Sequence, residues 1–251
     1  MARTPEGEAL TRVHRQRQLA VKAAVVRDVT RLWRGVDPTN LAGTIGPFAE
    51  ASAVVVRARH RDSVSVASRY FRNFRQVEDI SGLLPAPRPV QPPPLPVAAE
   101  VSRGASLAGI INARKRGFSP QAAARNGLVK VAGAASGLTM AGGRETLIGF
   151  LAEDDQALGW QRVTAADPCA FCAMIASRGA VFSASSADFE SHDHCSCTPE
   201  PFYEGSRTLS RNDRFRMLWD EVQREVPFER ADDNTRMNAF RRVYERGRAA
   251  L

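Results

Sequence analysis

The stretch DPCAFCAMIASRGAVFSASSADFESHDHCSCTPEPF, residues 167–202, decides how the second half of the chain folds. It holds all four cysteines of the sequence and two of its four histidines. The pattern is C-x2-C, nineteen residues, and then H-x2-C-x-C. A C-x2-C pair is a typical two-ligand half of a tetrahedral zinc site, because a short turn lets both thiolates face one point. The clustering therefore predicts one site built from this segment.

The candidate metal ligands are Cys169 and Cys172 in the first half of the segment and His192, Cys195 and Cys197 in the second. Two ligands from the first half, His192, and either Cys195 or Cys197 make a set of four. Four protein ligands leave no open position for water, so such a zinc site is structural. We expect the metal to fold a loop-rich segment that has no apolar core of its own.

Other chemistries fit these residues less well. Two disulfides are disfavoured because the N-terminus MARTPEGEAL lacks the apolar stretch of a secretion signal. A redox C-x2-C favours a thioredoxin-like βαβ setting, which the pattern does not show. Pro168 with the C-x2-C pair matches half of the zinc deaminase signature, but neither upstream histidine, His14 or His60, is followed by the required glutamate. A metal-free cluster of hydrogen-bonded thiols remains an alternative.

Upstream of this segment, helical patterns dominate. Apolar residues recur at three- and four-residue steps over residues 6–34, and a second helical run covers residues 47–78. The turn signal Asp37-Pro38 between the two runs predicts an antiparallel hairpin. Further helices are expected over residues 100–116 and 119–135, and Gly142-Gly143 are expected to separate another helix that follows them.

Around and beyond the cysteines, short strands are expected at residues 160–163 and 180–182, and two helices at residues 213–226 and 233–248. The fold class predicted from these patterns is mainly α (α+β). It consists of a helical hairpin and a helical domain with a small β and zinc-knuckle-like C-terminal segment.

Residues 84–96 read LPAPRPVQPPPLP, and seven of these thirteen residues are proline. Proline excludes helix and sheet there, so we expect a semi-rigid polyproline II strap, with a peptide ligand for a groove as the alternative. Together with the cysteine segment, the strap suggests four parts of the chain. They are an N-terminal helical hairpin (1–83), a proline-rich linker (84–98), a core with the Cys/His cluster (99–205) and C-terminal helices (206–251).

The charge is basic and uneven. The net charge is +8, and 32 of the 35 basic residues are arginine, which favours phosphate or carboxylate partners. Residues 161–205, by contrast, carry two basic and six acidic side chains. The densest basic stretch predicts contacts to DNA or a protein partner, with a solvated helix face as the alternative. It comprises Arg57, Arg59, Arg61, Arg69, Arg72 and Arg75. No apolar run is long enough to span a membrane.

At the cysteine segment the chain resembles the minor head proteins of tailed bacteriophages of the Mu F type. Those proteins have several helices, a C-x-x-C and then an H-P-N-C-R-C-type motif, and residues 169–172 and 192–197 occupy these places. The stretch 176–182, ASRGAVF, is similar to the versions in phages of actinobacteria. One departure is that Asp193-His194 replace the Pro-Asn of the motif.

The resemblance implies a virion protein in the head interior or at the portal vertex, present in the host cytoplasm during assembly. It implies the portal protein, major capsid or scaffold proteins and packaged DNA as partners, and roles in head assembly, DNA packaging or DNA delivery. Relatives are often labelled capsid maturation proteases. The sequence contains no G-x-S-x-G, H-E-x-x-H, Walker or dinucleotide motif, so we expect no enzyme. A maturation protease and a free-standing DNA-binding zinc module are the alternatives.

Overall fold

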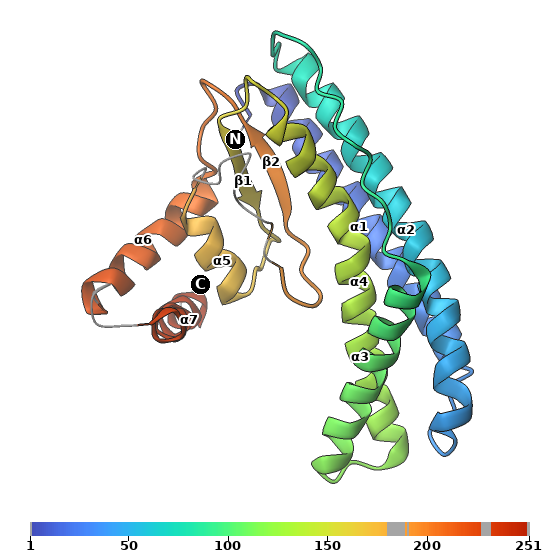
Figure 1. Cartoon of the computed structure of the whole chain (residues 1–251). Helices are drawn as coiled ribbons and strands as arrows, with labels where there is room; N and C mark the ends of the chain where they lie inside the picture. The colour runs from blue at the N-terminus through green and yellow to red at the C-terminus, as the bar shows by residue number, and fades with distance from the viewer. Residues whose placement is uncertain (1, 180–188, 190, 227–231, 250–251) are drawn as a thin grey trace.

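The computed structural model describes residues 2–179, 189, 191–226 and 232–249. Four long helices form a bundle, and a smaller C-terminal part lies against one side of it (Figure 1). The bundle helices are α1 (Pro5–Trp33), α2 (Leu41–Val77), α3 (Leu95–Lys115) and α4 (Pro120–Ala152). The smaller part contains β1 (Gly159–Val163), α5 (Ala170–Ser177), β2 (Thr198–Phe202), α6 (Ser210–Glu225) and α7 (Asp233–Ala249).

Helices α1 and α2 form the predicted hairpin, and Glu78 joins its two open ends. Thr4 caps α1 by accepting a hydrogen bond from the Gly7 backbone N–H (3.0 Å). The Glu78 carboxylate, at the end of α2, accepts hydrogen bonds from the backbone N–H groups of Arg3 (2.7 Å) and Thr4 (3.1 Å). A carboxylate at a helix N-terminus is favourable because the helix dipole is positive there.

The hairpin shares its core with the second pair of helices. Val29 of α1, Val56 of α2, Ile110 of α3 and Val131 of α4 belong to one buried cluster. Helix α2 begins six residues before the predicted start, because Asn40 caps it and the helix continues through Pro47, which removes one backbone hydrogen bond from its interior.

The expected helix break at Gly142-Gly143 is wrong, because α4 is continuous through both glycines. They lie where α4 meets α2, and a Cβ on Gly142 would come within 2.8 Å of the His60 carbonyl oxygen. The glycines therefore permit a close approach between two helices. A glycine needed for packing and one that ends a helix look the same in a sequence.

The proline-rich strap lies along α2 in extended form. Arginines of that helix hold the chain three residues before the strap and again near the end of the strap. The Arg75 guanidinium donates to the Ser81 carbonyl (2.7 Å), and that of Arg57 donates to the Pro93 carbonyl (2.5 Å). Helix α3 has 21 residues and α4 has 33, so α3 is about 18 Å shorter. The strap covers α2 where α3 does not reach.

In the C-terminal part, β1 and β2 form an antiparallel two-stranded ribbon in which Gly159 pairs with Phe202 and Val163 with Thr198. The expected strand at 160–163 is confirmed, whereas the one expected at 180–182 lies outside the described residues. The partner strand β2 and the short helix α5 were not expected. Helices α6 and α7 match the expected helices closely and pack on α5 through a separate apolar cluster that includes Phe215, Val222 and Phe240.

The predicted fold class is confirmed: the protein is mainly helical, with a small β element beside the cysteine cluster. None of the described helices is both long enough and apolar enough to cross a membrane.

Candidate metal centre

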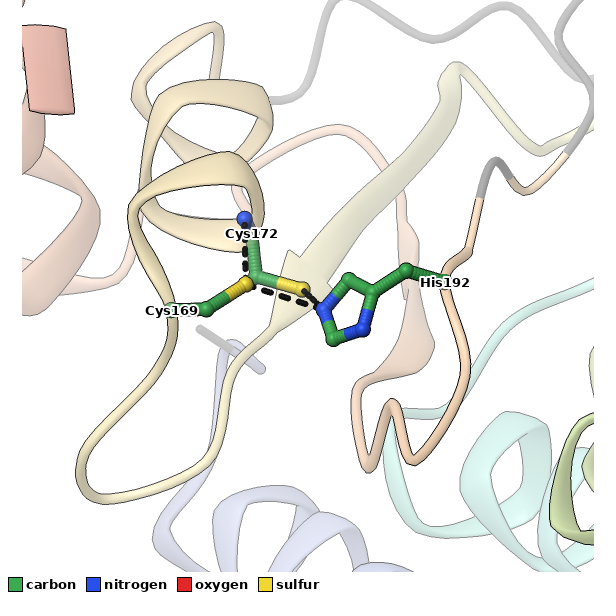
Figure 2. Close-up of side chains that lie close together, drawn as sticks. All are labelled: Cys169, Cys172 and His192. Atoms are coloured by element: carbon green, nitrogen blue, oxygen red, sulfur yellow. Dashed lines mark hydrogen bonds between the residues drawn. The ribbon is translucent and has the colours of Figure 1, made fainter. Parts of the chain in front are cut away.

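The C-x2-C pair occupies the first turn of α5. Cys169 is the N-cap residue, and its Sγ accepts a hydrogen bond from the Cys172 backbone N–H (3.4 Å). This geometry turns both sulfur atoms toward the same side of the helix start, as Figure 2 shows. Cys169 is exposed and Cys172 is buried. The pair is thus placed as the two-ligand half of a zinc site would be.

His192 comes from the loop before β2 and points its ring at both sulfurs (Figure 2). Its Nε2 lies 2.9 Å from Cys169 Sγ and 3.4 Å from Cys172 Sγ. Its Nδ1 lies 2.6 Å from the Asp193 carbonyl oxygen. When Nδ1 carries the proton and donates to that carbonyl, the Nε2 lone pair is free for a metal ion, which is the usual arrangement of a ligating histidine.

Cys195 and Cys197 complete the cluster from the buried side. The Sγ atoms of Cys172 and Cys195 are 3.7 Å apart. Two sulfurs on one tetrahedral zinc ion are separated by about 3.8 Å, given Zn–S bonds of about 2.3 Å. The ligand atoms form two groups, Cys169, Cys172 and His192 in one and Cys172, Cys195 and Cys197 in the other, each spanning less than 4.8 Å. Cys172 belongs to both groups and is the central residue of the cluster.

Cations of the bundle hold the loop that carries these ligands. The Arg144 guanidinium of α4 donates to the carbonyl oxygens of Cys197 and Cys195, both at 3.1 Å. Lys22 of α1 donates to the His194 carbonyl (2.5 Å) and to Ser196 Oγ (2.6 Å). The metal-ligand loop is therefore docked on two bundle helices that lie far from it in the sequence.

Two arginines stacked on the partly buried ring of Phe189 place further positive charge beside the cluster. The guanidinium groups of Arg144 and Arg162 lie 4.8 and 3.8 Å from the centre of the Phe189 ring. Both arginines are buried. Burial lowers the pKa of Arg144, and the charges of Cys195 and Cys197 oppose that shift. Buried cations are costly unless they are paired, so these surroundings favour a cluster with negative charge.

The thiols themselves divide into stronger and weaker acids. A hydrogen bond from the Cys172 thiol, followed by weaker contributions that include the charge of His192, lowers the pKa of Cys169 to about 5. The same hydrogen bond raises the pKa of Cys172. Hydrogen bonds from Cys172 and Cys197 lower the pKa of Cys195, and the charge of Arg144 adds to that effect. The cluster thus holds thiolates, the form of cysteine that binds metals.

The sequence matches the family model of the VG15 protein over residues 5–222, which include the bundle, all five candidate ligands and most of α6. The chain belongs to the VG15 protein family. This membership indicates a bacteriophage protein of the virion type. No curated protein and no solved structure matches the chain.

In this VG15 protein, the six arginines expected to contact DNA or a partner have different surroundings. Arg61, Arg69 and Arg72 are exposed on α2. Arg59 is half-buried and pairs with Asp28 (2.8 Å), with a second pairing to Asp62. Arg57, described above, binds the strap.

The expected contact with DNA or a partner is wrong for Arg75, the last of the six arginines. It is 4% exposed and forms an ion pair with Asp154. An outside partner cannot reach it, so the predicted contact surface is reduced to the exposed arginines of α2.

The charged residues around the cluster were missed by sequence reasoning. Lys22 and Arg144 lie 174 and 53 residues from the groups they bind, Ser196 and Cys197. A single sequence carries no signal for contacts at such separations. The only hint is that Lys22 is one of three lysines in a chain that otherwise uses arginine.

Proposed function

We propose that the protein is a minor head protein of a tailed bacteriophage. It associates with the portal in the head interior and aids head assembly, DNA packaging or DNA delivery. Membership in the VG15 family and the resemblance of residues 160–251 to Mu F-type minor head proteins support this proposal. The observation that carries it is the docked cysteine–histidine cluster, because it fixes a small loop-rich part to the bundle as a structural element does.

In this proposal the cluster holds one structural zinc ion. Cys169, Cys172, His192 and Cys195 would bind it, with Cys197 as the alternative to Cys195. Thiolates and an imidazole are the donors that zinc prefers, and the ion would cross-link α5 to the loop before β2. Three thiolates leave a zinc site with one net negative charge, which Arg144 and Lys22 offset.

Metal analysis of the purified protein tests the zinc site. We expect about one equivalent of zinc, and a cobalt-substituted form whose visible and thiolate charge-transfer bands report tetrahedral coordination with three sulfurs. Cys172→Ser should lose the metal, since Cys172 belongs to both ligand groups. The control is Ser177→Ala, which removes a hydroxyl from the same helix and should keep the metal. Metal-free wild-type protein would contradict the proposal.

Co-expression with the portal, major capsid and scaffold proteins of the same phage tests the head role. We expect the protein to copurify with the portal and to be detected by mass spectrometry in mature virions. Charge reversal of the exposed α2 arginines, as Arg61→Glu with Arg69→Glu, examines whether this face makes the contact. Absence from virions would exclude the head role, whatever the metal content.

A second function is favoured by one specific observation. Cys169 is exposed, stands at a helix N-terminus and lies 2.9 Å from His192, which is the arrangement of an activated thiol nucleophile. A groove of about 520 Å³ opens beside this pair and is lined by Phe171, Arg241 and Tyr244. A maturation protease that uses this thiol predicts that Cys169→Ala blocks capsid or scaffold cleavage while heads still assemble. Under the structural proposal, the same variant changes stability and leaves cleavage unaltered.

A further inference from the structure

A pocket of about 560 Å³ lies between α1 and the start of α6, next to the adjoining ends of β1 and β2. Arg12 and Arg15 of α1 line one side of it, and Thr164, Ser210 and Asn212 line the other. None of the five candidate metal ligands is among its lining residues.

Two buried donors in the pocket have no partner within the part of the chain that the structure describes. Thr164 is 3% exposed, and its hydroxyl oxygen lacks a hydrogen bond. The Nε of Arg15 is also buried without an acceptor. Buried polar groups are nearly always hydrogen-bonded, so two unpaired groups in one pocket indicate a ligand that supplies their acceptors.

The N-terminus of α6 adds further donors. Its N-cap residue is Leu209, and no side chain caps the helix. The Asn212 backbone N–H already donates to the Leu209 carbonyl (2.7 Å), whereas the N–H of Ser210, at the first helical position, has no acceptor within the helix. The helix dipole is positive at this end. Leu209 and Ser210 both line the pocket. An anionic group held there meets a guanidinium, a hydroxyl and a helix N-terminus.

The same pocket also offers acceptors. Asn212 is 1% exposed and donates through Nδ2 to the Arg162 carbonyl (3.2 Å), while its Oδ1 has no donor in the described residues. Glu8 and Glu200 line the pocket as well, and Glu200 accepts a hydrogen bond from Gln161 Nε2 (2.8 Å). Two carboxylates would repel a polyanion such as DNA. They suit a ligand whose single negative charge is flanked by N–H groups.

We propose that this pocket binds an acidic side chain of a peptide segment from a partner protein. Arg15, the Thr164 hydroxyl and the start of α6 receive the carboxylate, and Asn212 Oδ1 and Glu8 accept hydrogen bonds from the peptide N–H groups. This inference goes beyond the proposed head function and does not depend on it, because the pocket can be tested with the isolated full-length protein.

The test is NMR of the arginine Nε–H groups in the full-length protein, with the blocked tripeptide acetyl-Ala-Glu-Ala-amide as the probe. We expect saturable shifts of the Arg15 resonance, which Arg15→Gln identifies by its loss. The neutral tripeptide with Gln in place of Glu should bind at least about tenfold more weakly, because charge-assisted hydrogen bonds are roughly twice as strong as neutral ones.

Variants locate the binding. Arg15→Gln and the near-isosteric Thr164→Val should each weaken binding several-fold, measured by isothermal titration calorimetry because Arg15→Gln lacks the reporter resonance. Thr164→Val should leave the unliganded protein at least as stable as wild type, because the hydroxyl it removes is unpaired. The matched control is Arg17→Gln, which removes the same charge from an exposed position of α1 outside the pocket and should bind normally.

Three outcomes would overturn the proposal. The first is that the glutamate tripeptide causes no saturable shift in wild-type protein. The second is that it binds Arg15→Gln and wild type equally. The third is that inorganic phosphate or a short DNA duplex shifts the Arg15 resonance while the tripeptide does not, which would assign the pocket to phosphate groups instead.

Discussion

Arg75 illustrates how a residue's role depends on neighbours that the local sequence does not contain. It lies in the densest arginine stretch of the chain and was expected on the surface. In the structure its guanidinium pairs with Asp154 at the end of α4, and the Tyr203 hydroxyl donates to the same carboxylate (2.8 Å). It also donates to the Ser81 carbonyl, just before the strap. One buried side chain thus joins α2, α4, β2 and the strap.

Replacement of Arg75 should therefore be much more harmful than replacement of an exposed neighbour. We expect Arg75→Ala to lower the free energy of unfolding by about 3–5 kcal/mol, because Asp154 would remain buried without its cation. Arg72→Ala, three residues earlier on an exposed position of the same helix, should change it by less than about 0.5 kcal/mol. Urea denaturation measures both. Equal effects would show that the buried pair contributes little.

His14 makes stability depend on pH. Its ring is buried and stacks on Tyr70 with centroids 4.2 Å apart, and neither ring nitrogen has a partner in the described residues. Burial, with a smaller effect from the charge of Arg17, lowers the pKa of His14 from 6.5 to about 3. The unfolded chain therefore takes up the proton first. The contribution of neutral His14 is fully present above pH 6.5 and is lost as the pH falls toward 3.

At pH 5 this loss should amount to about 2 kcal/mol relative to pH 7, from 1.36 kcal/mol per pKa unit. His14→Phe keeps an aromatic ring on Tyr70 and removes the titration. We expect this variant to lose less stability than wild type between pH 7 and pH 5, as measured by urea midpoints at both values. Parallel pH profiles would show that His14 does not control stability in this range.

At the scale of elements, helices were more predictable than strands. Helical periodicity is local, and the helices expected over residues 6–34 and 233–248 agree closely with α1 and α7. Strand β2 was missed because it contains Pro199 and Pro201, which normally argue against a strand. Both prolines lie at alternate positions, opposite Arg162 and Trp160. In a two-stranded ribbon the N–H groups on the outer side are not needed for pairing, so proline is tolerated there.

The glycines of α4 provide a matched comparison within one helix. A Cβ on Gly142 would press against the His60 backbone of α2, whereas a Cβ on Gly137 meets nothing within 4 Å. We expect Gly142→Ala to lower the melting temperature, since two backbones would have to separate. Gly137→Ala should raise stability by about 0.5–1 kcal/mol, because alanine restricts the unfolded chain and favours the helix. Thermal denaturation of both variants decides; a stabilised Gly142→Ala protein would mean that α2 and α4 can move apart freely.

At the scale of the whole molecule, the gathering of the cysteines and His192 could be predicted from the sequence, and the docking of their loop on the bundle could not. The five candidate ligands fall within 29 residues, so their spacing alone brings them together. The cations that hold the loop come from α1 and α4, and Phe189 reaches the cluster from the segment between its two halves. These contacts depend on how the bundle and the C-terminal part pack, which no local pattern encodes.

The packing of the bundle and of the C-terminal part predicts how the molecule responds when the proposed zinc ion is removed. The bundle has a large apolar core of its own, whereas α5, α6 and α7 share a smaller cluster next to the cysteines. After chelation we expect hydrogen exchange to accelerate in α5–α7 and in β2, while the middle of α1, α2 and α4 stays protected. Hydrogen exchange with mass spectrometry, before and after chelation and again after zinc is restored, measures this. Uniform acceleration over all helices would contradict it.

The strap offers a place where the chain can be lengthened. Its ends are held by Arg75 and Arg57, and between them Arg88 and Pro89 are exposed. An inserted segment would bulge into solvent there, since the two clamps keep α2 and α3 in place, and closing a somewhat longer loop costs little entropy. A short epitope or fluorophore tag between Arg88 and Pro89 could therefore mark the protein inside an assembling particle and leave its helices undisturbed.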